Sequence, residues 1–163
     1  MKKIIAVVAL ICMMLTLCAC GGAKGGNLTF TTGGDQGTYY GFGGVMAQKV
    51  GEVTDTTVTA ITSGGSQANI YALQDGDAQL GFVQSDVMAY AYAGTRSFEA
   101  NGKIDSFRVV AGLYAEAVQL VTMDPSIKSV ADLAGKNVSI GAPGSGVYFN
   151  AIDILAAAGL TEA

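Results

Sequence analysis

Apolar and polar side chains alternate along residues 28–32, which predicts a β-strand, and the glycine-rich turn 33–37 follows it directly. From Thr38 the spacing becomes helical. Five apolar residues share one helical stripe there: Phe42, Val45, Met46, Val50 and Val53. The glycines among them lower helix propensity, so we expect close packing of this helix on a sheet.

The same order of elements is then repeated. We predict a strand at 57–61, a turn at 62–66, a helix over 67–74, a strand at 78–83, and a helix that begins at 84–86 and ends at Gly94. Ser66 is the expected N-cap of the first of these helices, and Gly76 lies just past its end. Strand, turn, capped helix and strand indicate an α/β fold with right-handed β-α-β units and a mainly parallel sheet.

The later part of the chain predicts a second unit of the same kind. Strand-like runs at 108–113 and 118–123 flank residues 114–117, where we place a crossover between two lobes. A short capped helix at 129–133, a strand at 137–140, the turn 141–146 and a helix over 147–158 follow.

The N-terminus has the features of an export signal. Lys2 and Lys3 precede an uncharged stretch, residues 4–17, which is short for a bilayer span. The following Cys18-Ala19-Cys20 resembles a bacterial lipoprotein signal. We expect a signal peptide at 1–19, a lipidated Cys20 and a flexible tether through 27. An uncleaved apolar anchor or an ordinary secretory signal would also place the rest outside the cytoplasm.

Composition removes several functions. The chain has no His, so a His-based triad and a zinc-His site are excluded, and Cys20 alone of the three cysteines would survive processing, which leaves no disulfide or cysteine metal site. Loss of Lys2 and Lys3 changes the formal net charge of −4 by −2, to −6, which argues against a nucleic-acid partner. We also expect the sequence to be about the first half of a longer protein, with exposed apolar surface and with weak or no ligand binding by this half alone.

Three turns share one composition, rich in glycine and hydroxyl groups: 33–38, 62–66 and 141–146. Each follows a predicted strand and begins a helix, where free N–H groups and the helix dipole favour a carboxylate, a phosphate or a carbonyl oxygen. In open α/β sheets such turns gather at the carboxyl edge of the strands, where ligands bind. The alternative is that glycine and serine serve only as turn and cap residues.

Known catalytic patterns do not fit. Asp35 stands where a dinucleotide fingerprint needs its second glycine, and no Gly-Lys-Ser/Thr run supplies a P-loop. Ser145 lacks the flanking glycines of a nucleophile elbow, because Pro143 and Val147 occupy those positions. We therefore expect binding rather than catalysis, with no cofactor and no metal.

A set of motifs carries a family resemblance. The segments 33–40 (GGDQGTYY), 62–69 (TSGGSQAN) and 76–86 (GDAQLGFVQSD), followed by 112–116, 129–136 and 141–146, resemble the TAXI-type solute receptors of tripartite ATP-independent (TRAP) transporters. The resemblance covers residues 28–160, and the motifs are specific as a set. Ala115, Ala117 and Val147 depart from the family pattern, which has proline at the first two positions and often a hydroxyl residue at the third.

The resemblance implies a periplasmic-binding-protein type II (Venus-flytrap) fold with two α/β lobes, here 28–115 and an incomplete second lobe at 116–163. It also implies a monomer that holds a small, often carboxylated ligand such as glutamate or glutamine and delivers it to a TRAP-type membrane permease. An ABC-type receptor of the sulfonate or thiamine-precursor kind shares the fold and remains an alternative. An α/β enzyme acting on phosphorylated substrates is a second one.

When the family's binding positions are transferred to this sequence, the resemblance predicts ligand-binding residues at the three glycine-rich turns, after the third strand and at the crossover. These are Gly34, Thr38, Tyr39, Ser66, Asn69, Gln84, Tyr114, Ser145 and Gly146. Hydroxyl and backbone N–H groups would donate to a carboxylate, and the amides of Asn69 and Gln84 could donate or accept. Asn69 could instead cap a neighbouring loop, and of Tyr39 and Tyr40 we expect only one in the cleft. Arg96 and Arg108 are expected on the surface.

Overall fold

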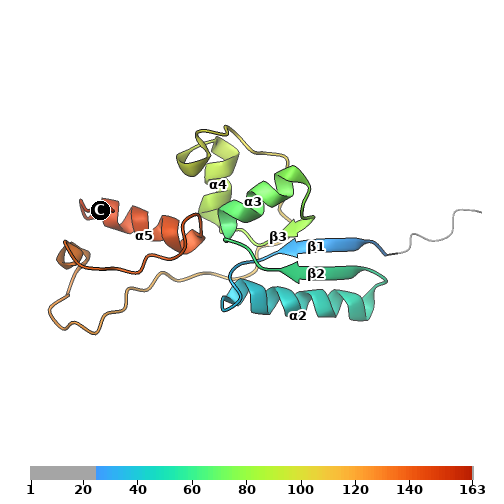
Figure 1. The fold of residues 1–163 in the computed structure, drawn as a ribbon, viewed down its shortest axis with the longest axis horizontal. Helices are drawn as coiled ribbons and strands as arrows, with labels where there is room; N and C mark the ends of the chain where they lie inside the picture. The colour runs from blue at the N-terminus through green and yellow to red at the C-terminus, as the bar shows by residue number, and fades with distance from the viewer. Residues whose placement is uncertain (1–24, 163) are drawn as a thin grey trace, which may run out of the picture.

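Three parallel strands form a sheet at one end of the structure, a computed structural model that describes residues 25–162 (Figure 1). They are β1 (Asn27–Thr31), β2 (Thr57–Ile61) and β3 (Leu80–Gly81), in the spatial order β2-β1-β3. The parallel pairing of β1 with both neighbours confirms the predicted β-α-β connections. The predicted lipidation site Cys20 and the rest of the signal lie outside the described residues.

Helices lie on both sides of this sheet. They are α2 (Thr38–Val53), α3 (Ser66–Asp75), α4 (Ser85–Ala93) and α5 (Gly146–Ala157), with short 3-10 helices η1 (Arg96–Phe98) and η2 (Val130–Leu133). Figure 1 shows α2 along one side of the sheet and α3 and α4 on the other, with α5 and η2 beyond the ends of the strands. No helix within residues 25–162 is both long and apolar enough to cross a membrane.

Local sequence signals place most of these boundaries. Gly76 and Gly94 end α3 and α4 in the left-handed conformation, at φ values of 81° and 68°, as predicted. The predicted N-cap Ser66 is wrong by one residue, because Gly65 is the cap and Ser66 is the first residue of α3. The reason is that the Ser66 hydroxyl is used elsewhere: it accepts a hydrogen bond from the Gln84 N–H at 3.0 Å.

One glycine of α2 is required by packing. A Cβ at Gly43 would lie 2.7 Å from Thr32 Cγ2 and 3.3 Å from Phe82 Cε2, so α2 approaches the sheet closely there. This confirms the expected role of a glycine in the helix, although Gly44 has open space around it. The predicted apolar stripe is only partly covered, since Val53 remains 79% exposed.

The main core lies between the helices. Its buried members come from α3, α4, η1, the following loop and α5: Ile70, Val87, Ala91, Phe98, Ile104 and Phe149. Because Phe149 of α5 is buried in the same cluster as residues of α3 and α4, the C-terminal helix is attached to the N-terminal unit through apolar contact as well as through polar groups.

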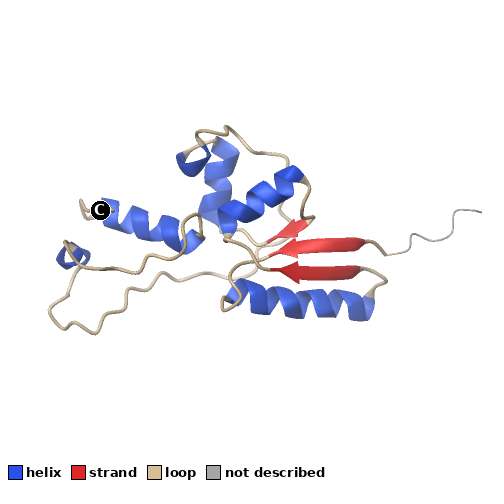
Figure 2. Cartoon of the chain, in the orientation of Figure 1, coloured by secondary structure: helices blue, strands red, loops and turns tan. Residues whose placement is uncertain are grey.

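The strands predicted at 108–113, 118–123 and 137–140 are wrong. All three runs are loop in the structure (Figure 2). A strand requires a neighbour for its backbone groups, and within residues 25–162 none lies beside these runs. Their apolar side chains stay exposed, with Val110 at 86% and Val121 at 87%, as the expectation of exposed apolar surface stated.

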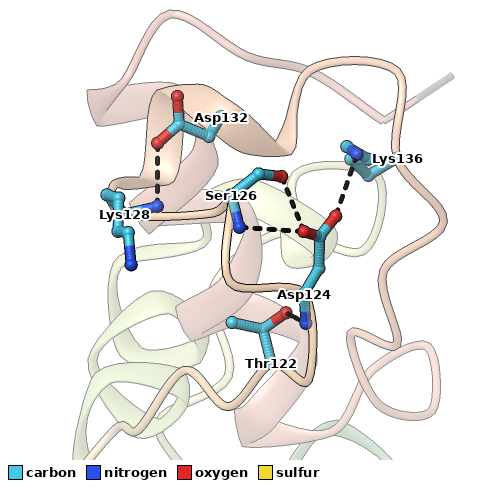
Figure 3. Close-up of polar contacts among 6 residues, drawn as sticks. All are labelled: Thr122, Asp124, Ser126, Lys128, Asp132 and Lys136. Carbon is cyan, nitrogen blue, oxygen red and sulfur yellow. Dashed lines mark hydrogen bonds and ion pairs between the residues drawn. The ribbon is translucent and has the colours of Figure 1, made fainter.

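Polar contacts hold the turn before η2 (Figure 3). Asp124 accepts hydrogen bonds from the Ser126 hydroxyl and backbone N–H and pairs with Lys136 at 3.2 Å. These contacts, the Ser126 hydroxyl first, lower the pKa of the Asp124 carboxyl. Asp132 completes a capping box with Ser129, which confirms the capped helix predicted at 129–133.

The close approach at Gly43 predicts opposite effects for neighbouring glycines. We expect Gly43→Ala to lower the free energy of unfolding by about 1–3 kcal/mol, because the added methyl overpacks against Thr32. Gly44→Ala is the matched control and should raise it by up to about 1 kcal/mol through helix propensity. Urea unfolding of the full chain measures both, and equal effects of the two substitutions would contradict the packing argument.

Candidate functional site

The carboxyl ends of the three strands open onto one cavity of about 570 Å³. The loops after β1, β2 and β3 line it, together with residues 116–120, the turn before α5 and one face of α5. In the strand order β2-β1-β3, successive strands are added first on one side of β1 and then on the other. The topological switch point therefore lies between β1 and β3, and open α/β sheets bind ligands at such a point.

Seven of the nine predicted binding residues line this cavity. They are Gly34, Thr38, Tyr39, Ser66, Gln84, Ser145 and Gly146. Of the adjacent tyrosines, Tyr39 lines the cavity and Tyr40 does not, as expected. The structure therefore brings together residues from four separate loops, at a place where a small molecule could contact all of them.

Asn69 lies outside the cavity and is fully buried in the protein interior. Its amide donates to the backbone carbonyls of Thr32 at 2.6 Å and Phe82 at 2.7 Å, and its Oδ1 accepts from the Thr31 hydroxyl at 2.7 Å. With these three bonds the side chain has little capacity left for a ligand. Its position joins the loop after β1 to the loop after β3, which corresponds to the alternative of an Asn that caps a neighbouring loop.

Tyr114 is also absent from the cavity wall. Its ring meets Phe42 of α2 edge-on at 6.1 Å between centroids, and 45% of the residue is exposed. Burial, followed by the charge of Glu116, raises the pKa of its phenol. In this arrangement Tyr114 covers α2 and lies near the site without lining it.

Three helices begin at the cavity and supply backbone N–H groups. The N-caps of α2, α3 and α5 are Gly37, Gly65 and Ser145, and all three border the cavity. Ser145 caps α5 by accepting from the Tyr148 N–H at 3.2 Å, and the Gln67 N–H of α3 donates to Gly144 O at 3.1 Å. The first N–H groups of α2 have no acceptor within the described part of the chain, so they are available to a ligand oxygen.

Glycine is required where the turns meet. A Cβ at Gly65, whose φ is 99°, would lie 3.2 Å from Ser145 Cα, and a Cβ at Gly146 would collide with the Gln84 amide. The turn after β2 and the turn before α5 are therefore in direct contact, and a side chain at Gly65 would separate them, whereas a side chain at Gly146 would displace Gln84.

Sequence reasoning missed Glu116. Its carboxylate lines the cavity and accepts a hydrogen bond from the Tyr39 hydroxyl at 3.2 Å. Burial, and then the charge of Glu116, raises the pKa of Tyr39 well above the usual tyrosine value, so the phenol stays protonated and keeps donating. The segment 112–116 had been matched to the family as a motif, but nothing in the sequence alone showed that this carboxylate would face Tyr39.

Sequence reasoning also predicted too few cavity-lining residues on α5. Val147, Asn150, Ala151 and Ile154 line the cavity at the spacing of one helix face. Asn150 accepts from the Gln84 amide at 2.7 Å and donates to Asp86 at 2.7 Å. Asn150 is the one polar residue on this otherwise apolar helix face, and that pattern could have identified it from the sequence.

The two arginines considered as carboxylate partners do not line the cavity. Arg96 forms an ion pair with Asp153 of α5, and Tyr90 donates to the same carboxylate at 2.9 Å. Arg108 donates to the carbonyls of Asp105 and Phe107. Arg96 thus joins η1 to α5 while Tyr90 joins α4 to the same carboxylate, and neither arginine lines this cavity.

The arrangement is that of a ligand-binding α/β protein: a small cavity at the carboxyl edge of a parallel sheet, bordered by helix N-termini and polar side chains. Within residues 25–162 no group of His, Cys, Asp or Glu side chains is arranged to hold a metal ion. The chain matches the NMT1-like family over residues 30–163, and it belongs to that family. This is a family of the periplasmic substrate-binding type, whose members are binding proteins and not enzymes.

The buried position of Asn69 predicts a structural effect on substitution. We expect Asn69→Ala to lower the free energy of unfolding by about 2–4 kcal/mol, because two buried carbonyls and one hydroxyl lose their partner. Thr31→Val removes only one of the three bonds and is expected to cost about 1–2 kcal/mol. Urea unfolding measures both. A neutral Asn69→Ala substitution would show that the three bonds contribute little.

Proposed function

We propose that this protein is an extracytoplasmic solute-binding protein that captures a small carboxylated metabolite, of the glutamate or glutamine kind, and delivers it to a TRAP transporter. The observation that carries the proposal is the meeting of three helix N-termini and seven motif residues at one cavity of about 570 Å³. Free N–H groups and hydroxyls there suit a carboxylate.

Two transporter classes remain candidates. The order and spacing of the motifs between residues 33 and 146 favour a TAXI-type receptor and a TRAP permease. The NMT1-like match favours the second candidate, an ABC-type receptor of the sulfonate or thiamine-precursor kind. A neighbouring gene for a permease with many apolar spans, without an ATPase gene beside it, would support the first; an adjacent ATPase gene would support the second.

The proposed organisation is a monomer with two lobes that close on the ligand. The first would comprise residues 28–115 and the second would begin at 116. The cavity fits this division, because its walls come from loops on both sides of that boundary. Direct contact between the turn after β2 and the turn before α5 suits a closed arrangement of such lobes.

The anchoring proposal predicts that Cys20 controls fractionation. Two acyl chains on Cys20 would hold the protein stably at the membrane, whereas one would bind only marginally. We expect the protein in the membrane fraction and Cys20→Ser in the soluble fraction, measured by immunoblot after export. Cys18→Ser is the matched control and should stay with the membrane. Membrane retention of Cys20→Ser would contradict the anchor.

The binding proposal predicts that filling the cavity blocks the ligand. Gly34 lines the cavity and a Cβ at that position meets no protein atom within 4 Å, so Gly34→Leu adds a bulky side chain at the cavity wall without a clash. We expect at least about tenfold weaker binding, which is 1.4 kcal/mol, with an unchanged melting temperature. Isothermal titration of the full-length protein against amino acids, dicarboxylates and sulfonates measures this.

The control for Gly34→Leu is Gly44→Leu, another substitution with open space around it but outside the cavity. It should leave affinity unchanged. No heat of binding for any compound in the panel would contradict the proposed ligand class, and equal affinities for the wild type and Gly34→Leu would contradict this cavity as the site.

A further inference from the structure

Electric charge is unevenly distributed around the cavity. Glu116 is the one charged side chain that lines it, and no Lys or Arg does so among residues 25–162. A ligand carboxylate would therefore depend on N–H groups and hydroxyls, as at the start of α2, while a negative side chain lies on the wall formed by residues 116–120. A purely anionic ligand would be repelled by this carboxylate.

The Glu116 carboxylate has no positive partner in the part of the chain that the structure describes: none of the ion pairs there includes it. The carboxylate accepts a hydrogen bond from Tyr39, whose ring in turn packs against Phe82 at 5.0 Å between centroids. Tyr39 thus orients one carboxylate oxygen, and the Tyr114 phenol also lies beside this carboxylate, so the groups next to Glu116 are neutral tyrosines and not cations. A charged group held in this way beside a cavity suits a ligand cation.

We propose that Glu116 binds a protonated amino group of the ligand, so that the site selects an amine-bearing, zwitterionic solute over a carboxylate or sulfonate without an amine. The inference rests on the proposed function and adds a specificity-determining residue to it. The negative group of the ligand would contact the helix N-termini, and its ammonium group would lie toward Glu116 and Tyr39.

Matched pairs of compounds that differ only in the amino group test this: glutamate against glutarate, and taurine against ethanesulfonate. Isothermal titration of the full-length protein should give at least tenfold tighter binding of the amine in the pair that binds, which corresponds to about 1.4 kcal/mol. The two pairs also distinguish a carboxylate ligand from a sulfonate ligand.

Substitution of Glu116 separates its role from a general effect on binding. Glu116→Gln keeps the size and the hydrogen bond from Tyr39 but removes the charge, and should weaken binding of the amine about tenfold while leaving the desamino compound unchanged or improved. Glu116→Asp keeps the charge and should retain the preference for the amine. Because Glu116 is exposed, both variants should show the wild-type melting temperature.

An equal loss of both members of a pair in Glu116→Gln, or binding of glutarate as tight as that of glutamate, would overturn the role of Glu116 while the proposed receptor function stands. Binding of no compound by the wild type would overturn the proposed ligand class together with this inference.

Discussion

The buried amide of Asn69 holds the site together although it does not line the cavity. One side chain on α3 bonds to the carbonyls of Thr32 and Phe82 and to the hydroxyl of Thr31. These partners lie at the ends of β1 and β3, where the cavity-lining loops begin. Because β3 is only two residues long, its ladder with β1 is short, and the Asn69 bonds help to set the distance between the two loops.

This scaffold directs backbone dipoles at the cavity rather than charged side chains. The starts of α2, α3 and α5 border it, and Arg96 is paired with Asp153 of α5 and does not line the cavity. A neutral set of donors holds an anionic group without a permanent positive charge. The single carboxylate of Glu116 then makes the cavity electrically asymmetric, and this asymmetry gives a bound zwitterion a preferred orientation.

The N-terminal half was predictable because its signals are local. Alternation predicted a strand at 28–32, which the structure has at Asn27–Thr31, and left-handed glycines such as Gly76 and Gly94 ended their helices within a residue or two of the prediction. Local pattern failed where the outcome depended on distant partners. The run 118–123 is strand-like in composition, but in the described structure no neighbouring strand pairs with it.

The same distinction applies to the site. Loop composition predicted the position of the cavity, because a glycine-rich turn followed by a helix start can be recognised from a few consecutive residues. The pairing of Tyr39 with Glu116 spans 77 positions and that of Gln84 with Asn150 spans 66, and no local signal reports either contact. The hydrogen bonds from the Asn69 amide to carbonyls of other elements also have no signal in the local sequence. For this reason a buried core residue was predicted to contact the ligand.

Gln84 links the cavity to the position of α5. Its amide donates to Asn150 at 2.7 Å and to Asp86 at 3.2 Å, so both of its N–H groups have acceptors in this arrangement. A solute that accepts from Gln84 must therefore replace one of these acceptors, and the net gain is the difference between two hydrogen bonds. If Asn150 is the one replaced, α5 loses a polar contact to α4 while Phe149 stays in the core. Ligand binding and the placement of α5 are then coupled through one amide, and the strength of that coupling is limited to the cost of exchanging a single bond.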